Sequence, residues 1–120
     1  MNDTLLQKTN NLIDLLYEAK EKFESRGDRV PDFFTEVKPF ADKVKDECDA
    51  WLPLAEAFAA RTRANYIHPS QLTAAAENIQ SLSIYALQPD MRERRFKELL
   101  SSVDYVLHQL KTGLTESARQ

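Results

Sequence analysis

Glycine is scarce in this chain: only Gly27 and Gly113 occur among its 120 residues. β-Hairpins depend on glycine at left-handed turn positions, so the scarcity argues against a β-rich fold. It also excludes, as they are usually written, the phosphate-binding Walker loop, the dinucleotide fingerprint and the nucleophile elbow. We therefore expect an all-helical protein. Because no catalytic motif is present, we also predict that the protein is not an enzyme.

The size and composition of the chain fit one domain. With 42% hydrophobic and 29% charged residues, a chain of this length buries enough surface to fold without disulfides or a structural metal. The predicted domain covers residues 1–120, and residues 115–120 form a polar tail that we expect to fray.

The expected location is the cytoplasm. Cys48 is the only cysteine, so no disulfide can form within the chain, and a lone thiol is typical of a reducing compartment. The longest apolar runs have four residues, whereas a membrane-spanning helix needs about 20. The first residues also lack the basic cluster and apolar stretch of a secretory signal. We therefore predict no membrane contact.

Apolar residues recur at spacings of three and four in four separate segments, which is the pattern of amphipathic helices. The first segment lies between Thr4, predicted to cap it, and Gly27, predicted to end it. The third starts with Pro69, and the fourth has Asp90 as its predicted N-cap. The apolar faces contain Leu5, Leu12, Leu16, Ala19 and Phe23; Val37, Ala41, Val44, Cys48, Trp51, Ala55 and Phe58; Leu72, Ala75, Ala76, Ile79, Leu82 and Ala86; and Phe96, Leu99, Leu100, Val103, Val106, Leu107, Leu110 and Leu114.

Two prolines complicate the second segment, because proline lacks an amide donor and clashes with the preceding helical turn. Either Pro39 lies in the first turn of a helix capped near Thr35, or a short turn over residues 32–38 precedes the main helix. Pro53 is predicted to kink or interrupt the helix. Four further apolar residues are expected to widen the buried face of this segment: Phe33, Phe34, Phe40 and Leu52.

Four amphipathic helices with short connections can hide their apolar faces only against one another. We therefore predict an antiparallel up-down-up-down four-helix bundle, with the second helix kinked or interrupted by Pro39 or Pro53. In this topology the connection after the first helix lies at the same end as the start of the fourth helix.

Several groups of residues between Asp32 and Lys111 form a familiar pattern. They are Asp32-Phe33-Phe34 followed by Lys38-Pro39, then Arg63 with Tyr66-Ile67-His68 and Gln71, then Arg95-Phe96-Lys97, and finally Ser102-Val103, Tyr105 and Leu107-His108. In these groups, which span about two thirds of the chain, the sequence resembles the YppE-like family of small bacterial proteins. The resemblance implies a cytoplasmic helical bundle without an assigned biochemical role, and it supplies no catalytic residues.

The sequence favours neither a metal site nor a cofactor. Helical bundles often hold di-iron centres through Glu-x-x-His pairs, but neither His68 nor His108 has a glutamate three residues before it. Asp104 and His108 lie four residues apart and are expected to make only a weak surface contact. Cys48 occupies a core position where its thiolate is disfavoured. The aromatic residues at core spacing are interpreted as packing, and a small-ligand or metal-binding bundle is our third functional hypothesis.

A basic run in the first turns of the fourth segment is the candidate anion-binding site. Its cations are Arg92, Arg94, Arg95 and Lys97. Arg26 and Arg29, from the connection after the first helix, are expected to converge on the same rim. Interspersed acids can neutralise the run, and a net charge of −3 with a pI of about 5.4 is atypical of a dedicated nucleic-acid binder. Nucleic-acid binding is therefore disfavoured.

The opposite end of the predicted bundle carries the candidate partner-binding residues Arg63, Tyr66 and His68. Arginine and tyrosine are frequent anchors of protein interfaces, although these residues also fit plain helix-end roles. Our main hypothesis is a non-enzymatic interaction module that binds an unidentified protein or a second copy of itself as a homodimer. The alternative is an anion or nucleic-acid binder that uses the basic run.

Overall fold

The four apolar segments form four helices. The computed structural model describes residues 2–27, 30–62 and 67–118. Over these ranges the chain forms α1 (Asn2–Glu24), α2 (Lys38–Thr62), α3 (Pro69–Tyr85) and α4 (Glu93–Ala118), with a short π-helical turn, η1 (Phe33–Val37), directly before α2. The described residues contain no strand, so the all-helical prediction is confirmed.

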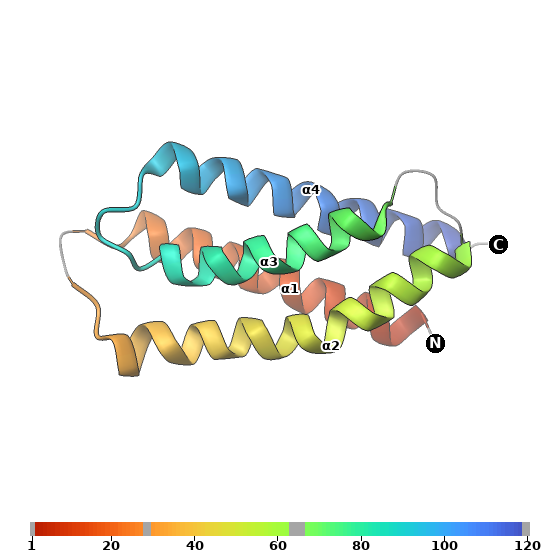
Figure 1. Ribbon diagram of the computed structural model, residues 1–120, viewed down its shortest axis with the longest axis horizontal. Coiled ribbons are helices and arrows are strands. Elements are labelled where there is room, and N and C mark those ends of the chain that lie inside the picture. The colour runs from red at the N-terminus through yellow and green to blue at the C-terminus, as the bar shows by residue number, and fades with distance from the viewer. Residues whose placement is uncertain (1, 28–29, 63–66, 119–120) are drawn as a thin grey trace.

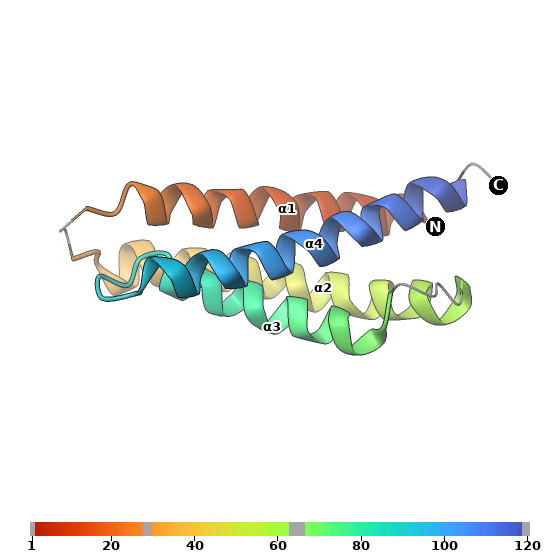
Figure 2. The same cartoon turned by 90° about the horizontal axis from the view of Figure 1, so that it is seen from above.

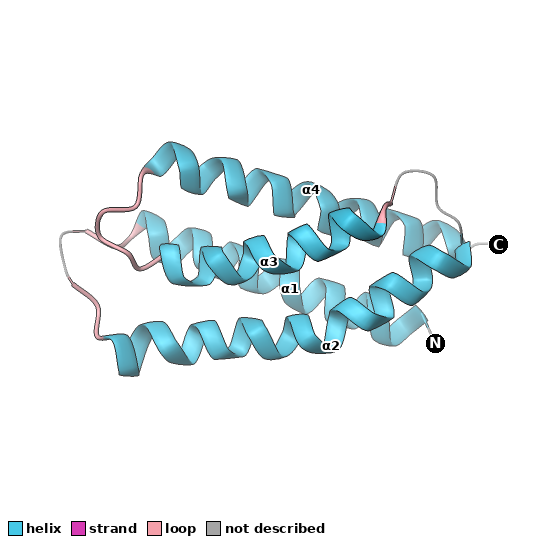
Figure 3. Ribbon diagram, viewed as in Figure 1, coloured by secondary structure: helices cyan, strands magenta, loops and turns pink. Residues whose placement is uncertain are grey.

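Successive helices run in opposite directions, and α4 returns to pack against α1. The α1–α2 and α3–α4 connections lie at one end of the molecule, whereas α1 begins and α4 ends at the other (Figure 1). Seen from above, α4 crosses obliquely, from the side of α3 at its start to the side of α1 at its end (Figure 2). Loops are confined to the ends (Figure 3). The predicted up-down-up-down bundle is confirmed, and its longest dimension is 50 Å.

The core lies along the bundle axis and is formed by the predicted apolar faces. Nearly all of their residues are buried, while Ala41, Leu100 and Val106 are partly buried. Trp51 of α2 is 0% exposed, and its indole N–H donates to Thr9 Oγ1 of α1 at 3.0 Å. The Thr9 hydroxyl donates in turn to the Leu5 carbonyl at 2.8 Å. The polar atoms of this part of the core are therefore paired, as burial requires.

Helix ends agree less well with the sequence predictions than helix faces do. Thr4 lies inside α1, which begins at Asn2, so the predicted cap at Thr4 is wrong. Asp90 does not cap α4, because the helix begins three residues later and the Asp90 carboxylate accepts from the Gln88 side chain instead. Gly27 does adopt the left-handed backbone conformation, with φ of 58°. Pro69 opens α3 as predicted.

The start of α2 resolves one of the two proline questions. A short turn, η1, precedes the helix, and Pro39 is the second residue of α2, where its missing amide is harmless. This is the second of the two alternatives. The helix continues without a break across Pro53, so Pro53 does not interrupt it. The kink at Pro53 stays a prediction.

Helix α4 runs as far as Ala118, so the segment predicted as a tail is helical over residues 115–118. Residues 119 and 120 lie outside the described part of the chain. Among the residues described, no helix combines the length and the apolar composition that crossing a membrane requires.

Candidate functional site

An exposed aromatic pair marks the turn between α1 and α2. Phe33 is 55% exposed and Phe34 is 75% exposed, and their rings meet edge to face with centroids 5.3 Å apart. Val30, just before them, is 77% exposed. The expectation that Phe33 and Phe34 widen the buried face is wrong, because η1 winds more loosely than an α-helix and directs only Val37 toward the core. We call Val30, Phe33 and Phe34 the aromatic turn.

Hydrogen bonds hold the backbone of this turn in a defined shape. The Thr35 amide donates to the Asp32 carboxylate at 3.0 Å, and the Asp32 amide donates to the Glu36 carboxylate at 3.1 Å. The hydrogen bond from the Thr35 amide lowers the pKa of Asp32, and a smaller contribution from the Thr35 hydroxyl lowers it further. The Asp32 carboxylate, which caps the start of η1, therefore stays ionised at neutral pH. It fixes two phenylalanines that face water.

A groove of about 490 Å³ runs beside the aromatic turn, between α1 and the start of α2. Phe40, Pro39 and Leu87 provide its apolar lining, and Arg26, which follows α1, and Lys43 of α2 are among its charged lining residues. Neither cation has an ion-pair partner within the ranges that the structure describes. The lining also holds Glu36 and the Lys22–Glu18 ion pair, so the groove combines apolar surface with three cations and two carboxylates.

Arg26 also connects α1 to the start of α4. Its guanidinium lies 3.6 Å from the centroid of the Phe23 ring, and that ring stacks on Phe96 of α4 with centroids 4.0 Å apart. The same side chain donates to the Phe23 carbonyl at 3.2 Å and to the Met91 carbonyl at 3.4 Å. The predicted approach of Arg26 to the basic run is therefore confirmed, whereas Arg29 lies outside the described residues.

Half of the basic run is neutralised within α4. Lys97 pairs with Glu93 at 2.8 Å, and Arg94 pairs with Glu98 at 3.2 Å. The hydrogen bond from Lys97, more than its charge, lowers the pKa of Glu93, and the same bond raises the pKa of Lys97. Two exposed cations have no ion pair in the described part of the chain: Arg92 and Arg95.

At the opposite end, only one of the three candidate partner-binding residues is described. His68 is exposed and precedes α3, and its backbone amide donates to Gln71 Oε1 at 3.0 Å. Arg63 and Tyr66 lie outside the described residues, so their role stays a prediction.

A polar cluster that sequence reasoning missed joins α1 to α4. The Tyr17 hydroxyl donates to Asp104 Oδ1 at 3.0 Å and lies 3.1 Å from His108 Nε2. The predicted contact between Asp104 and His108 is present, at 3.2 Å. Burial raises the pKa of Tyr17, and the hydrogen bond to the Asp104 carboxylate raises it further. Only the three-dimensional fold brings Tyr17 to this pair.

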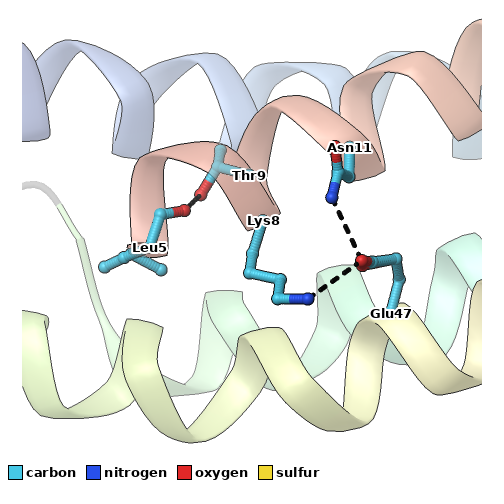
Figure 4. A network of polar contacts seen from close by, with 5 residues as sticks. All are labelled: Leu5, Lys8, Thr9, Asn11 and Glu47. Atoms are coloured by element: carbon cyan, nitrogen blue, oxygen red, sulfur yellow. Dashed lines mark hydrogen bonds and ion pairs between the residues drawn. The ribbon is translucent and has the colours of Figure 1, made fainter. Parts of the chain in front are cut away.

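A second polar contact links α1 to α2. Glu47 Oε1 accepts from Asn11 Nδ2 at 3.1 Å and lies 3.4 Å from Lys8 Nζ (Figure 4). Its other oxygen, Oε2, is buried and has no hydrogen-bond partner among the described residues. The half-satisfied carboxylate helps to fix α1 on α2, and nothing in its surroundings indicates catalysis.

The predicted burial of Cys48 is confirmed. The side chain lies in the core, and burial raises the pKa of its thiol from 9.0 to about 12. A thiol of this kind is inert at neutral pH. Over the described ranges, no group of three or more His, Cys, Asp and Glu side chains is placed to hold a metal ion.

The helix order and the packing define a small antiparallel four-helix bundle whose polar and exposed aromatic groups gather at its connections and along α4. The profile described as "Bacterial domain of unknown function (DUF1798)" matches residues 6–114, so the chain belongs to this family. The family resemblance inferred from the sequence is thereby confirmed.

Relatives of the chain support the same conclusion. The uncharacterized protein YppE of Bacillus subtilis (strain 168) is 25% identical over 113 residues, which cover 92% of each chain. A crystal structure of a protein of unknown function from Listeria innocua has a TM-score of 0.93 at 25% identity, with 99% of this chain and 97% of that chain covered. The crystal structure of the Bacillus subtilis protein also gives 0.93, at 23% identity, covering 100% of this chain and 99% of that one, and shows the shared fold.

Proposed function

We propose that this protein is a non-enzymatic, cytoplasmic interaction module that binds a partner protein through the aromatic turn. The observation that carries the proposal is the exposure of Phe33 and Phe34 on a backbone held by side-chain caps. Exposed aromatic rings leave favourable burial unused, and large aromatic side chains are frequent anchors of protein interfaces. A turn that is already ordered also loses little conformational freedom on binding.

The chemistry beside the turn indicates an acidic partner segment. The cations that line the groove, Arg26, Lys43 and Lys22, outnumber its two carboxylates by one, and an acidic segment would complement this excess. The apolar lining at Phe40 and Leu87 suits an aliphatic or aromatic side chain next to those carboxylates. We therefore assign to the groove and the aromatic turn a protein segment in which acidic and apolar residues adjoin.

Replacing both phenylalanines by serine, Phe33→Ser with Phe34→Ser, is expected to weaken partner binding at least about tenfold while leaving the fold intact, because anchor residues carry most of the energy of an interface. The partner is first recovered from bacterial cytosol on the wild-type protein. Its binding is then measured by titration calorimetry with each variant, and urea unfolding checks the stability of the variants.

Leu54→Ser is the matched control, since Leu54 is an exposed apolar residue in α2, well along the helix from η1. It is expected to bind like the wild type. Binding that survives the double substitution, or the absence of any saturable partner, would refute the proposal. Loss of binding on Arg63→Ala with Tyr66→Ala, but not on the double serine change, would move the contact to the opposite end of the bundle.

The unpaired arginines at the start of α4 favour a second candidate function, anion binding. If Arg92 and Arg95 contact phosphates, affinity for a short DNA duplex falls steeply with added salt, and Arg92→Ala with Arg95→Ala lowers the slope of log affinity against log salt by about 2. Fluorescence anisotropy at several salt concentrations measures this slope. Arg94→Ala is the control because Arg94 already pairs with Glu98. Affinity that is absent or independent of salt would reject the function.

A further inference from the structure

Three potential ligand atoms meet on the surface between α1 and α4. Tyr17 Oη, Asp104 Oδ1 and His108 Nε2 are separated by 3.0, 3.1 and 3.2 Å, so they form a nearly equilateral triangle. Tyr17 is 43% exposed, and the other two side chains are about half exposed. A depression of about 600 Å³ opens beside Asp104 and His108. The triangle can therefore be reached from solvent.

The triangle has the dimensions of one face of a metal coordination sphere. Transition-metal ions bind imidazole nitrogen and carboxylate oxygen at about 2.0–2.2 Å. With an ion about 2.1 Å from all three atoms, the donor–ion–donor angles would be about 95°, and moving the donors apart by about 0.3 Å would bring them to the tetrahedral angle of about 109° that Zn²⁺ prefers. Solvent can fill the positions on the open side. The three donors need no large rearrangement to reach this geometry.

The cluster has one hydrogen atom fewer than it has close polar contacts. The hydrogen atoms that can serve the three contacts are the one phenol O–H of Tyr17 and at most one N–H at His108 Nε2. Two protons therefore serve three close contacts. A cation between the donors would satisfy all three lone pairs at once, and the phenolate and carboxylate charges would together balance a divalent ion.

We propose that Tyr17, Asp104 and His108 form a binding site for a divalent transition-metal ion of the Zn²⁺ type. On binding, the O–H bond of Tyr17 breaks, its proton passes to the buffer, and the ion forms coordinate bonds to the phenolate, the carboxylate and the imidazole. Imidazole and phenolate select transition metals over Mg²⁺ and Ca²⁺, which prefer sites built from carboxylate and carbonyl oxygens. The site is independent of the aromatic turn, which lies at one end of the bundle.

The test is a titration of the full-length, chelator-treated protein with ZnCl₂. Calorimetry in two buffers of different ionisation enthalpy is expected to show one ion per chain and the release of about one proton. The ultraviolet difference spectrum is expected to show ionised tyrosine. Excess Mg²⁺ or Ca²⁺ is expected to leave both signals unchanged.

Tyr17→Phe is expected to abolish the tyrosine signal and the proton release and to weaken binding at least about tenfold, since even losses outside the ligand set cost about 10–100-fold. His108→Ala is expected to weaken binding at least as much. Two matched controls should bind like the wild type: Tyr105→Phe, an exposed tyrosine beside the same depression, and His68→Ala, the other histidine.

Circular dichroism confirms that each variant keeps its helices, so a loss of binding is not a loss of fold. The proposal is overturned if Zn²⁺ does not bind with saturable one-to-one stoichiometry. It is also overturned if Tyr17→Phe and His108→Ala bind like the wild type, or if His68→Ala abolishes binding. In those cases the cluster is a hydrogen-bonded link between α1 and α4 only.

Discussion

Trp51→Ala is expected to destabilise the bundle by about 3–5 kcal/mol, the usual cost of removing a buried tryptophan. Trp51 is 0% exposed and connects α2 to α1 through its hydrogen bond to Thr9. The change leaves a large cavity where two helices meet. Because domains of this kind are stable by only about 5–15 kcal/mol, a substantial part of the stability is lost.

Urea unfolding followed by far-ultraviolet circular dichroism measures this loss without depending on tryptophan fluorescence. Phe34→Ala is the control, because a change at this exposed ring is expected to stay within about 0.5 kcal/mol. Thr9→Val removes the hydroxyl that accepts from the indole and donates to the Leu5 carbonyl, and it leaves the buried indole N–H unpaired, so its expected cost is about 1–3 kcal/mol. Equal stabilities of Trp51→Ala and Phe34→Ala would contradict the described core.

The thiol of Cys48 is expected to react with a disulfide reagent at least about tenfold more slowly in the folded protein than in the unfolded chain. Burial raises its pKa from 9.0 to about 12, and the thiolate is the reactive form. The reaction is followed by absorbance near neutral pH, with and without denaturing urea. Equal rates in the two conditions would show that the thiol is accessible and ordinary.

The same pKa difference makes stability depend on pH. Above about pH 9 the unfolded thiol loses its proton while the folded thiol keeps it, so the folded state binds more protons and its stability falls as pH rises, until the folded thiol also ionises near pH 12. The slope contributed by this one group is at most about 1.4 kcal/mol per pH unit. Cys48→Ala isolates it, because tyrosines and lysines that titrate in this range remain in the variant.

The helix faces could be predicted from the sequence because burial imposes a regular spacing on apolar residues, which local reading detects. The helix ends could not be predicted in this way, because several alternative hydrogen-bonding arrangements compete there. Asp90 has the composition of a cap, but its carboxylate accepts from Gln88, and the Met91 amide bonds to the Gln88 carbonyl before α4 begins. Two further residues, Met91 and Arg92, therefore belong to the connection.

The candidate sites were less predictable, since they depend on contacts between distant parts of the chain. Asp104 and His108 were visible as a pair with helical spacing, whereas Tyr17 lies 87 residues before Asp104 and follows the buried Leu16 at the edge of the apolar face of α1. The one local signal of a polar contact to another helix was an aromatic residue with a polar tip at such an edge. Phe33 and Phe34 were misassigned because the helical period does not extend into η1.

The positions of the start of α1 and the end of α4 also decide where a fusion tag can be attached without covering the aromatic turn. Helix α1 begins and α4 ends at the end of the bundle opposite η1, in a molecule 50 Å long (Figure 1). A fluorescent reporter or an affinity handle genetically fused beside either helix terminus therefore sits remote from Phe33 and Phe34. Immobilisation through such a handle would orient those rings toward the bulk solution.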